Sequence, residues 1–349
     1  PFDTMPVGDA QGGMASKLPP KVYAVISNRL AQLPPSARDI VGVAAIIGRA
    51  FTTDILAQAS DLGEDALAGA LDELWQRRIV RQTDGGGLAF DFSHDKIRDV
   101  AYAEVSPLQR RRLHLRVARA FEQASGDALD AASAQIASHY EHAGLPAQAA
   151  AFYRRAAGVA QSVYAYDDAI ALLTRGLAQA DRIADPQERA AQSLALQLDL
   201  APPIRIARGW AAPELEVPLR QAVELSRLAG DSSQQARAQV SLSFFMAVRA
   251  ELAQARSLSE ELIAQLGPCG ADTYSVMAWT SVMGSLVQQG DWMAAEPAYQ
   301  RAYNAYDEAQ HAEHASLMGG NFGVLATAWS AHALWFRGLA DQALQRGHE

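Results

Sequence analysis

The chain has 349 residues, a net charge of −9 and a hydrophobic content of 49%, of which little is aromatic. At about one domain per 100–200 residues, this length predicts two or three hydrophobic cores. The composition is rich in Ala, Leu, Gln, Arg and Glu and poor in β-branched runs, so it predicts a mainly α protein. A single cysteine, Cys269, excludes an internal disulfide, and no apolar run approaches the roughly 20 residues that cross a bilayer. We therefore expect a cytoplasmic chain without a membrane partner.

The acidic excess lies in the second part of the chain. Residues 1–122 hold 15 basic and 15 acidic side chains, whereas residues 123–349 hold 15 and 24. Neither part has the basic excess that binding to nucleic-acid phosphates requires. We therefore do not expect DNA to be a partner.

Residues 1–20 are expected to be a linker from a missing upstream domain, because glycines and prolines replace any apolar periodicity there. The chain begins with Pro1 rather than Met and ends at Glu349 within an apparent helix. These features predict that the sequence is a piece of a longer protein.

Residues 21–124 are expected to form a winged-helix-like domain. Apolar periodicity predicts helices over 21–33, 36–47, 53–60 and 63–78, and Thr52-Thr53 is a typical cap for the third. The one convincing strand signal follows, where 79–82 and 88–92 flank a glycine-rich turn and predict a β-hairpin. Helices followed by one hairpin are the layout of a winged helix, which belongs to the helix-turn-helix class.

Residues 125–349 are expected to form a TPR-like α-solenoid, because helix pairs follow one another without a further strand signal. In the TPR pattern a small residue on the second helix of each pair packs closely against the first helix. Five segments fit this pattern, and their small residues are Ala149, Ala169, Ala255, Ala295 and Ala343. Their separations of 20, 86, 40 and 48 residues depart from the usual repeat of about 34 residues, which predicts a degenerate array. The alternative is a generic helical bundle.

Several stretches resemble a known family. Residues 18–30, 33–38, 44–51 and 92–102 and Leu113-His114 resemble the segment directly after the ATPase core of large bacterial STAND-type regulators. Residues 208–214 and 334–344 resemble the TPR tails of the subgroup that joins an adenylate/guanylate cyclase domain to an AAA-like ATPase, and LuxR-type regulators have similar tails. The resemblance implies a winged helix that restrains an upstream NTPase, ATP or ADP bound in that upstream domain, and a TPR array that binds a protein or peptide effector.

The sequence itself lacks the motifs of catalysis. It contains no Gly-x-x-x-x-Gly-Lys-[Ser/Thr] loop, and Gly85-Gly86-Gly87 has no following Lys. A cyclase's paired metal-binding carboxylates in a βαβ context and a Gly-x-Ser-x-Gly elbow are also missing. We therefore expect a chain that is not an enzyme and holds no cofactor of its own.

The resemblance singles out His94 and Asp95. Phe-Ser-His-Asp after the second strand resembles the Met-His-Asp motif of related NB-ARC switches, in which the His touches bound ADP; Ser93 replaces the Met. This implies that His94 senses the nucleotide state and that Asp95 orients the start of the helix. The alternative is that Ser93 or Asp95 merely caps a helix over 94–105 and that His94 packs locally.

Two groups of charged residues bear on binding to nucleic acid or to an acidic partner. One helix carries Arg110, Arg111, Arg112, Arg116 and Arg119. We expect it to be a solvated face paired with acidic neighbours. Helix 64–78 would be the recognition helix of a DNA-reading winged helix, but its Glu64, Asp65, Asp72 and Glu73 would repel phosphates. A transcription regulator with a DNA-binding winged helix remains the alternative function.

Histidine pairs one helical turn apart occur at His139/His142 and His311/His314. Because no third ligand with metal spacing follows, we expect polar surface histidines and no metal site. Cys269 is expected to be a loop thiol without a catalytic partner.

Overall fold

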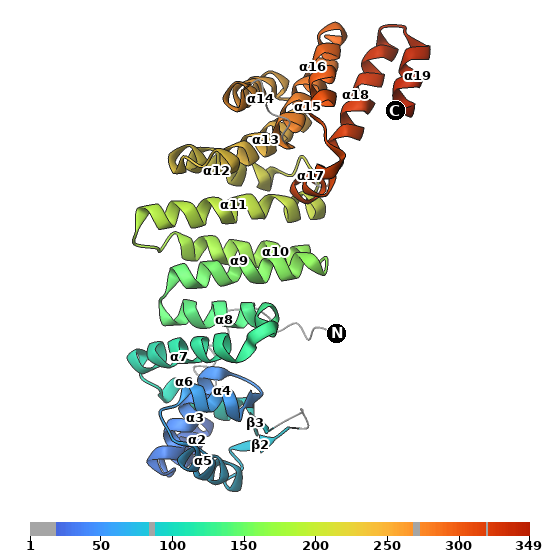
Figure 1. The fold of residues 1–349 in the computed structure, drawn as a ribbon. Coiled ribbons are helices and arrows are strands. Elements are labelled where there is room, and N and C mark those ends of the chain that lie inside the picture. Colours follow the sequence, from blue (N-terminus) through green and yellow to red (C-terminus); the bar gives the residue numbers. More distant parts are fainter. Residues whose placement is uncertain (1–18, 84–87, 268–272, 319) are drawn as a thin grey trace. The chain divides into compact units, whose positions relative to one another are not determined.

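The computed structural model describes residues 19–83, 88–267, 273–318 and 320–349 (Figure 1). Its contacts divide the chain into two compact units, residues 1–156 and 157–349. Helices make up most of each unit, and short strands occur in the first. The predicted fold class, a mainly α chain with a TPR-like helical solenoid, is confirmed.

The first unit begins with four helices and a small sheet. These elements are α2 (Pro20–Ala31), α3 (Pro35–Ile47), β1 (Phe51–Thr52), α4 (Thr53–Ala59), α5 (Glu64–Gln76), β2 (Val80–Gln82) and β3 (Ala89–Phe92). Helix α3 is the centre of this core, because every residue from Ile40 to Ile47 is buried and α4, α5 and α6 (Asp95–Glu104) pack around it. Pro35 begins α3, and Gly48 ends it with a φ of 115° that favours glycine.

The predicted hairpin is confirmed, with one strand that the sequence analysis did not foresee. Strands β2 and β3 pair antiparallel, and β1 pairs with the other edge of β3 to give the order β1-β3-β2. The Phe51 ring stacks on Phe90, with 6.3 Å between ring centroids, while the Thr52 side chain caps α4. A strand of two residues is too short to show an alternating pattern, so its sequence carried no signal. The glycines of the predicted turn lie outside the described residues.

The rest of the first unit is a run of helices: α6, α7 (Pro107–Ser125), the short η2 (Gly126–Ala128), α8 (Leu129–Ala143) and α9 (Pro146–Ser162), which spans the division between the units. Helices α7 and α8 pack against each other. The proposed boundary between residues 124 and 125, and the identity of residues 21–124 as a winged helix, stay predictions. Most of the expected linker lies outside the described residues.

The second unit contains successive helices that pack on their neighbours. They are α10 (Tyr166–Ala180), α11 (Pro186–Arg208), η3 (Pro213–Leu215), α12 (Glu216–Ala229), α13 (Ser232–Val248), α14 (Leu252–Leu266), α15 (Thr273–Gln288), α16 (Trp292–Ala305), η4 (Glu308–Gln310), α17 (His311–Met318), α18 (Phe322–Phe336) and α19 (Ala340–His348). None of the described residues of this unit belongs to a strand. Among the described helices of the chain, none has both the length and the apolar character to cross a membrane.

A repeated turn confirms the degenerate array at the atomic level. Five turns share one hydrogen-bonding pattern around a residue with a positive φ of 63–82°: Gly144, Tyr164, Ala250, Gly290 and Gly338. In each turn the amide of the following residue donates to the carbonyl five positions earlier at 2.9–3.0 Å, which closes the preceding helix. Five positions after each of these residues lies one of the predicted alanines, and all five alanines are buried at 0–7% exposure. The sequence pattern therefore reflects one structural unit repeated five times.

Candidate functional site

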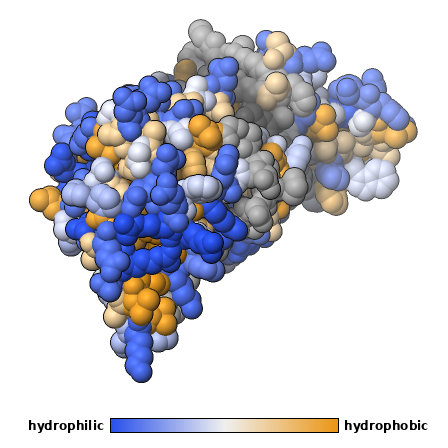
Figure 2. All heavy atoms as spheres, turned by 90° about the horizontal axis from the view of Figure 1, so that it is seen from below, coloured by the Kyte–Doolittle hydropathy of each residue, from blue (hydrophilic) through white to orange (hydrophobic). Residues whose placement is uncertain are grey.

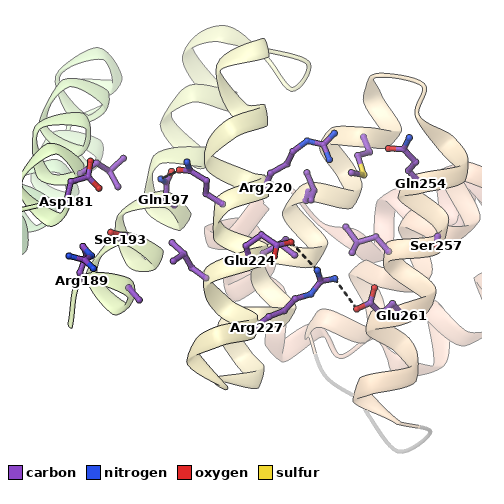
Figure 3. Close-up of a pocket in the computed structure, with 18 of the residues that line it drawn as sticks. Asp181, Arg189, Ser193, Gln197, Arg220, Glu224, Arg227, Gln254, Ser257 and Glu261 are labelled. Carbon is purple, nitrogen blue, oxygen red and sulfur yellow. Dashed lines mark hydrogen bonds and ion pairs between the residues drawn. The ribbon is translucent and has the colours of Figure 1, made fainter. Parts of the chain in front are cut away.

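A groove of about 1190 Å³ lies in the second unit, lined by residues of α10 to α14 (Figure 3). Helix α13 supplies apolar side chains, among them Leu242 and Met246. Helices α11, α12 and α14 each supply polar residues three or four positions apart, and such residues share one face of a helix. These stripes are Arg189, Ser193 and Gln197 on α11, Arg220, Glu224 and Arg227 on α12, and Gln254, Ser257 and Glu261 on α14.

The side chain of Gln197 is the most unusual polar group of this groove. It is only 7% exposed. Its Nε2 donates to Oε1 of Gln221 at 2.6 Å, whereas its own Oε1 has no hydrogen-bond partner among the described residues. A buried carbonyl left without a donor costs about 1–3 kcal/mol. This oxygen is shielded from solvent in the unbound groove. An N–H of a bound molecule reaches it when the terminal amide of Gln197, whose rotation has broad minima, turns towards the groove.

Ion pairs hold Arg227 in the middle of the groove. Its guanidinium lies 3.2 Å from Glu224 on its own helix and 3.2 Å from Glu261 on α14, as Figure 3 shows. Both carboxylates are exposed, so each pair contributes at most about 1 kcal/mol to stability. The arrangement fixes the guanidinium and gives Arg227, Glu224 and Glu261 together a net charge of −1.

The other two arginines of the groove have different partners. Arg220 pairs with Glu216 at 3.1 Å and with Glu251 at 3.8 Å, and Arg189 donates to the carbonyl of Ile183 at 2.9 Å. Asp181 differs, because this exposed carboxylate forms no ion pair within the part of the chain that the structure describes. Arg189 likewise forms no ion pair with any described residue, so these groove side chains and their ion-pair partners carry a net charge of −2.

The structure places His94 and Asp95 at the start of α6, immediately after β3. His94 is the N-cap residue, with φ −148° and ψ 138°, and its exposed side chain makes no capping hydrogen bond. Asp95 lies in the first turn and pairs with Arg49. The alternative, in which Ser93 or Asp95 caps this helix, is not seen, because the described structure gives α6 no side-chain cap. The nucleotide-sensing role of His94 and Asp95 stays a prediction.

A buried histidine cluster lies between α7 and α8. The Tyr102 hydroxyl lies 3.1 Å from Nε2 of His114, and the Nδ1 atoms of His114 and His139 are 2.9 Å apart. The ring of His142 stacks on His114 with 4.7 Å between centroids. His114 and His139 are 2% and 6% exposed.

Burial keeps the two inner imidazoles of this cluster neutral. It lowers the pKa of His114 to about 2, and repulsion by His139, His142 and Arg110 adds to the effect. Burial also lowers the pKa of His139 to about 3, with a further contribution from His142. Charging either ring would place an ion in the packed core without a counter-charge.

The expectation of polar surface histidines was therefore wrong for His139 and for His314, which is fully buried. Long-range packing is the reason, because α7 brings His114 to His139 from 25 positions away. Within the described parts of the chain, no group of three or more His, Cys, Asp or Glu side chains is arranged to hold a metal ion. Cys269 and the side chain of His311 are outside the described parts.

The basic cluster of α7 is used for local contacts. Arg116 pairs with Asp61 at 2.7 Å, while Arg110 and Arg111 donate to the carbonyls of Val105 and Ala143. The expected pairing with an acidic neighbour is seen for Arg116, whereas Arg110 and Arg111 bind carbonyls instead. The groove residues, by contrast, were not singled out by sequence reasoning. Polar residues at helical spacing are common, and the four-residue spacing of Arg189, Ser193 and Gln197 is the one signal that marked a shared face.

The chain is similar to parts of two known proteins. No family model matches the chain. An uncharacterized protein of Rhizobium meliloti (strain 1021) is 29% identical over 206 residues, which cover 58% of this chain and 20% of that protein. A crystal structure of a STAND protein with a tetratricopeptide repeat sensor from Pyrococcus horikoshii matches with 12% identity and a TM-score of 0.42, over 93% of this chain and 64% of the other. The chain thus spans less than two thirds of either protein, and a likeness at this TM-score carries no argument about its function.

Proposed function

We propose that the chain is a regulatory, protein-binding segment of a larger ATP-dependent signalling protein. In this proposal, residues 21–124 form a winged-helix-like module that restrains an upstream NTPase, and the helical array of residues 125–349 binds a protein or peptide effector. The role of the segment is regulation and binding rather than catalysis.

The groove of α10 to α14 is the observation that carries the binding part of the proposal. It combines apolar side chains such as Met246 with polar stripes on three helices. Its Gln197 carbonyl lacks a donor, so the array contains a hydrogen-bonding group that its own fold does not satisfy. Apolar contact area together with a few unsatisfied polar groups is what a recognition site offers.

The nucleotide part of the proposal rests on the sequence resemblance. In support, the exposed His94 ring stands at the start of α6, where backbone amides of the first turn point outwards and favour an anion. The neighbouring Asp95 is held by Arg49. A phosphate of ADP on an upstream ATPase is the ligand that we propose for His94.

The alternative of a DNA-binding winged helix receives no support. Glu64, Asp65 and Asp72 of α5 are exposed, and their charge repels phosphates. Figure 2 shows that the face around α2 and α5 is largely hydrophilic, with small hydrophobic patches. A protein partner is therefore favoured over DNA.

A groove-blocking label tests the binding function. Short peptides are first selected from a displayed random library on the purified chain. Their affinity is then measured for a Cys269→Ser chain in which Ser257→Cys, on the exposed groove face of α14, carries a bulky maleimide. The matched control carries the same label at Ser162→Cys, an exposed position at the end of α9.

The proposal predicts that the label at residue 257 abolishes binding of the selected peptides and that the label at residue 162 leaves it unchanged. The proposal would be contradicted if the library yielded no binder, or if the selected peptides bound the chain labelled at residue 257 as tightly as the unlabelled chain.

A further inference from the structure

We infer that the groove of α10 to α14 takes an extended peptide segment that carries a basic side chain, with a main-chain N–H of the segment donating to Oε1 of Gln197. This inference rests on the proposed function and specifies the chemistry of its partner. Three features of the groove lead to it: the unsatisfied carbonyl, the distribution of free charge, and the length of the polar stripe on α11.

The Gln197 carbonyl selects for a donor and against an acceptor. Its amide nitrogen is already used by Gln221, so the oxygen is the group left to bind. Every residue of an extended peptide except proline presents a main-chain N–H. A contact of this kind is independent of side-chain identity and therefore sets the register of the chain rather than its sequence.

The net negative charge of the groove favours a ligand with a positively charged side chain. Two of the groove's arginines are ion-paired, Arg227 with two carboxylates and Arg220 with two others, whereas Arg189 donates to a backbone carbonyl. Asp181 forms no ion pair with any residue that the structure describes, and it lines the groove at the end of α10. Residues 157–349 also hold 13 basic against 21 acidic side chains, so the field of this unit attracts cations. A peptide carboxylate would find one groove arginine without a carboxylate partner among the described residues, Arg189, against a net charge of −2.

The α11 stripe fits an extended segment of a few residues. From Arg189 to Gln197 the helix rises about 12 Å, which corresponds to about four residues of extended chain. Asp181, at the end of the neighbouring helix α10, lies on the same side of the groove as Arg189 in Figure 3. A basic side chain a few residues from the bound N–H therefore reaches Asp181, while apolar side chains between them meet the apolar residues of the groove.

Positional peptide pools test this chemistry. Acetylated and amidated pools of short peptides, each with one position fixed as Lys, Arg, Asp or Glu, are titrated against the full chain. Lys and Arg pools are expected to bind about three- to fivefold more tightly than Asp and Glu pools, the scale of an exposed ion pair, and the ratio should fall with added salt. Asp181→Asn should lower the ratio about twofold, whereas the control Asp168→Asn, exposed on α10 outside the groove, should leave it unchanged.

A second variant isolates the hydrogen bond. Gln197→Met keeps the length of the side chain and removes its carbonyl, so every pool should weaken by a similar factor of about three to ten. If Asp and Glu pools bind best, if Asp181→Asn leaves the ratio unchanged, or if Gln197→Met has no effect in a folded chain, the inference fails while the proposed function stands. If no pool binds the chain at all, both fail.

Discussion

The Nδ1 atoms of His114 and His139 face each other at 2.9 Å between two packed helices. At that distance one nitrogen donates and the other accepts, so the two rings have different tautomers. The hydroxyl of Tyr102 lies 3.1 Å from the other nitrogen of His114. A consistent chain of bonds follows if Tyr102 donates to Nε2 of His114 and Nδ1–H of His114 donates to His139. Both imidazoles are then neutral.

This arrangement predicts an acid-sensitive fold. The pKa values of His114 and His139 are about 2 and about 3 in the folded chain, against about 6.5 in the unfolded chain. Between the folded and unfolded pKa values, the unfolded state therefore binds more protons than the folded state. The contribution of the two neutral imidazoles to the free energy of unfolding is complete above about pH 6.5 and is lost as the pH falls below it. The free energy of unfolding should decrease by about 4 kcal/mol at most between pH 7.5 and pH 5, as measured by urea titration. The double variant His114→Leu/His139→Phe should lose most of this slope, and an unchanged slope would contradict the assignment.

Removal of one hydroxyl tests the proton chain within the same cluster. Tyr102→Phe leaves Nε2 of His114 buried without a donor, which should cost about 1–3 kcal/mol of stability. Tyr303→Phe removes a hydroxyl from a side chain that is 55% exposed and should change the melting temperature little. Equal melting temperatures for both variants would show that the Tyr102 hydroxyl does not donate a stabilising hydrogen bond to His114.

The repeated turn predicts a stabilising substitution. Ala250 has a φ of 63° at a position where the equivalent turns of residues 290 and 338 have glycine. Ala250→Gly should therefore raise the free energy of unfolding by about 1 kcal/mol, and Gly290→Ala should lower it by a similar amount. Ala191→Gly, in the exposed interior of α11, is the matched control and should destabilise by about 1 kcal/mol. A loss of stability in Ala250→Gly would refute the shared geometry.

His94 should affect nucleotide retention and not folding. Its side chain is exposed and caps nothing, so His94→Ala should leave the melting temperature of the chain within the range of a surface substitution. In a longer protein that joins the chain to an ATPase, loss of a charge-assisted bond worth about 2 kcal/mol should shift the resting equilibrium roughly thirtyfold towards the active state. Unchanged ADP retention and basal output in His94→Ala would end the sensor hypothesis.

Much of the fold could be predicted from local signals. The proline pair before α3, the glycine after it and the apolar period of each helix are properties of short segments, and the buried alanines of the array follow from the same reasoning. Strand β1 could not be predicted, because its pairing depends on β3, which lies some forty residues further along. The histidine cluster was missed for the same reason. The groove depends on side chains of five helices, which lie far apart in the sequence. That the Gln197 carbonyl lacks a donor can be recognised once the structure shows its amide bonded to Gln221.

The most direct test of the central claim observes a single methyl group. Of the seven methionines of the chain, Met246 lines the groove, and Met277 and Met283 are buried in α15. In a spectrum of the chain labelled at its methionine methyl groups, addition of a peptide selected on the chain should shift the Met246 resonance, assigned through Met246→Leu, and leave those of Met277 and Met283 in place. A bound peptide that leaves the Met246 resonance unmoved would contradict recognition in this groove.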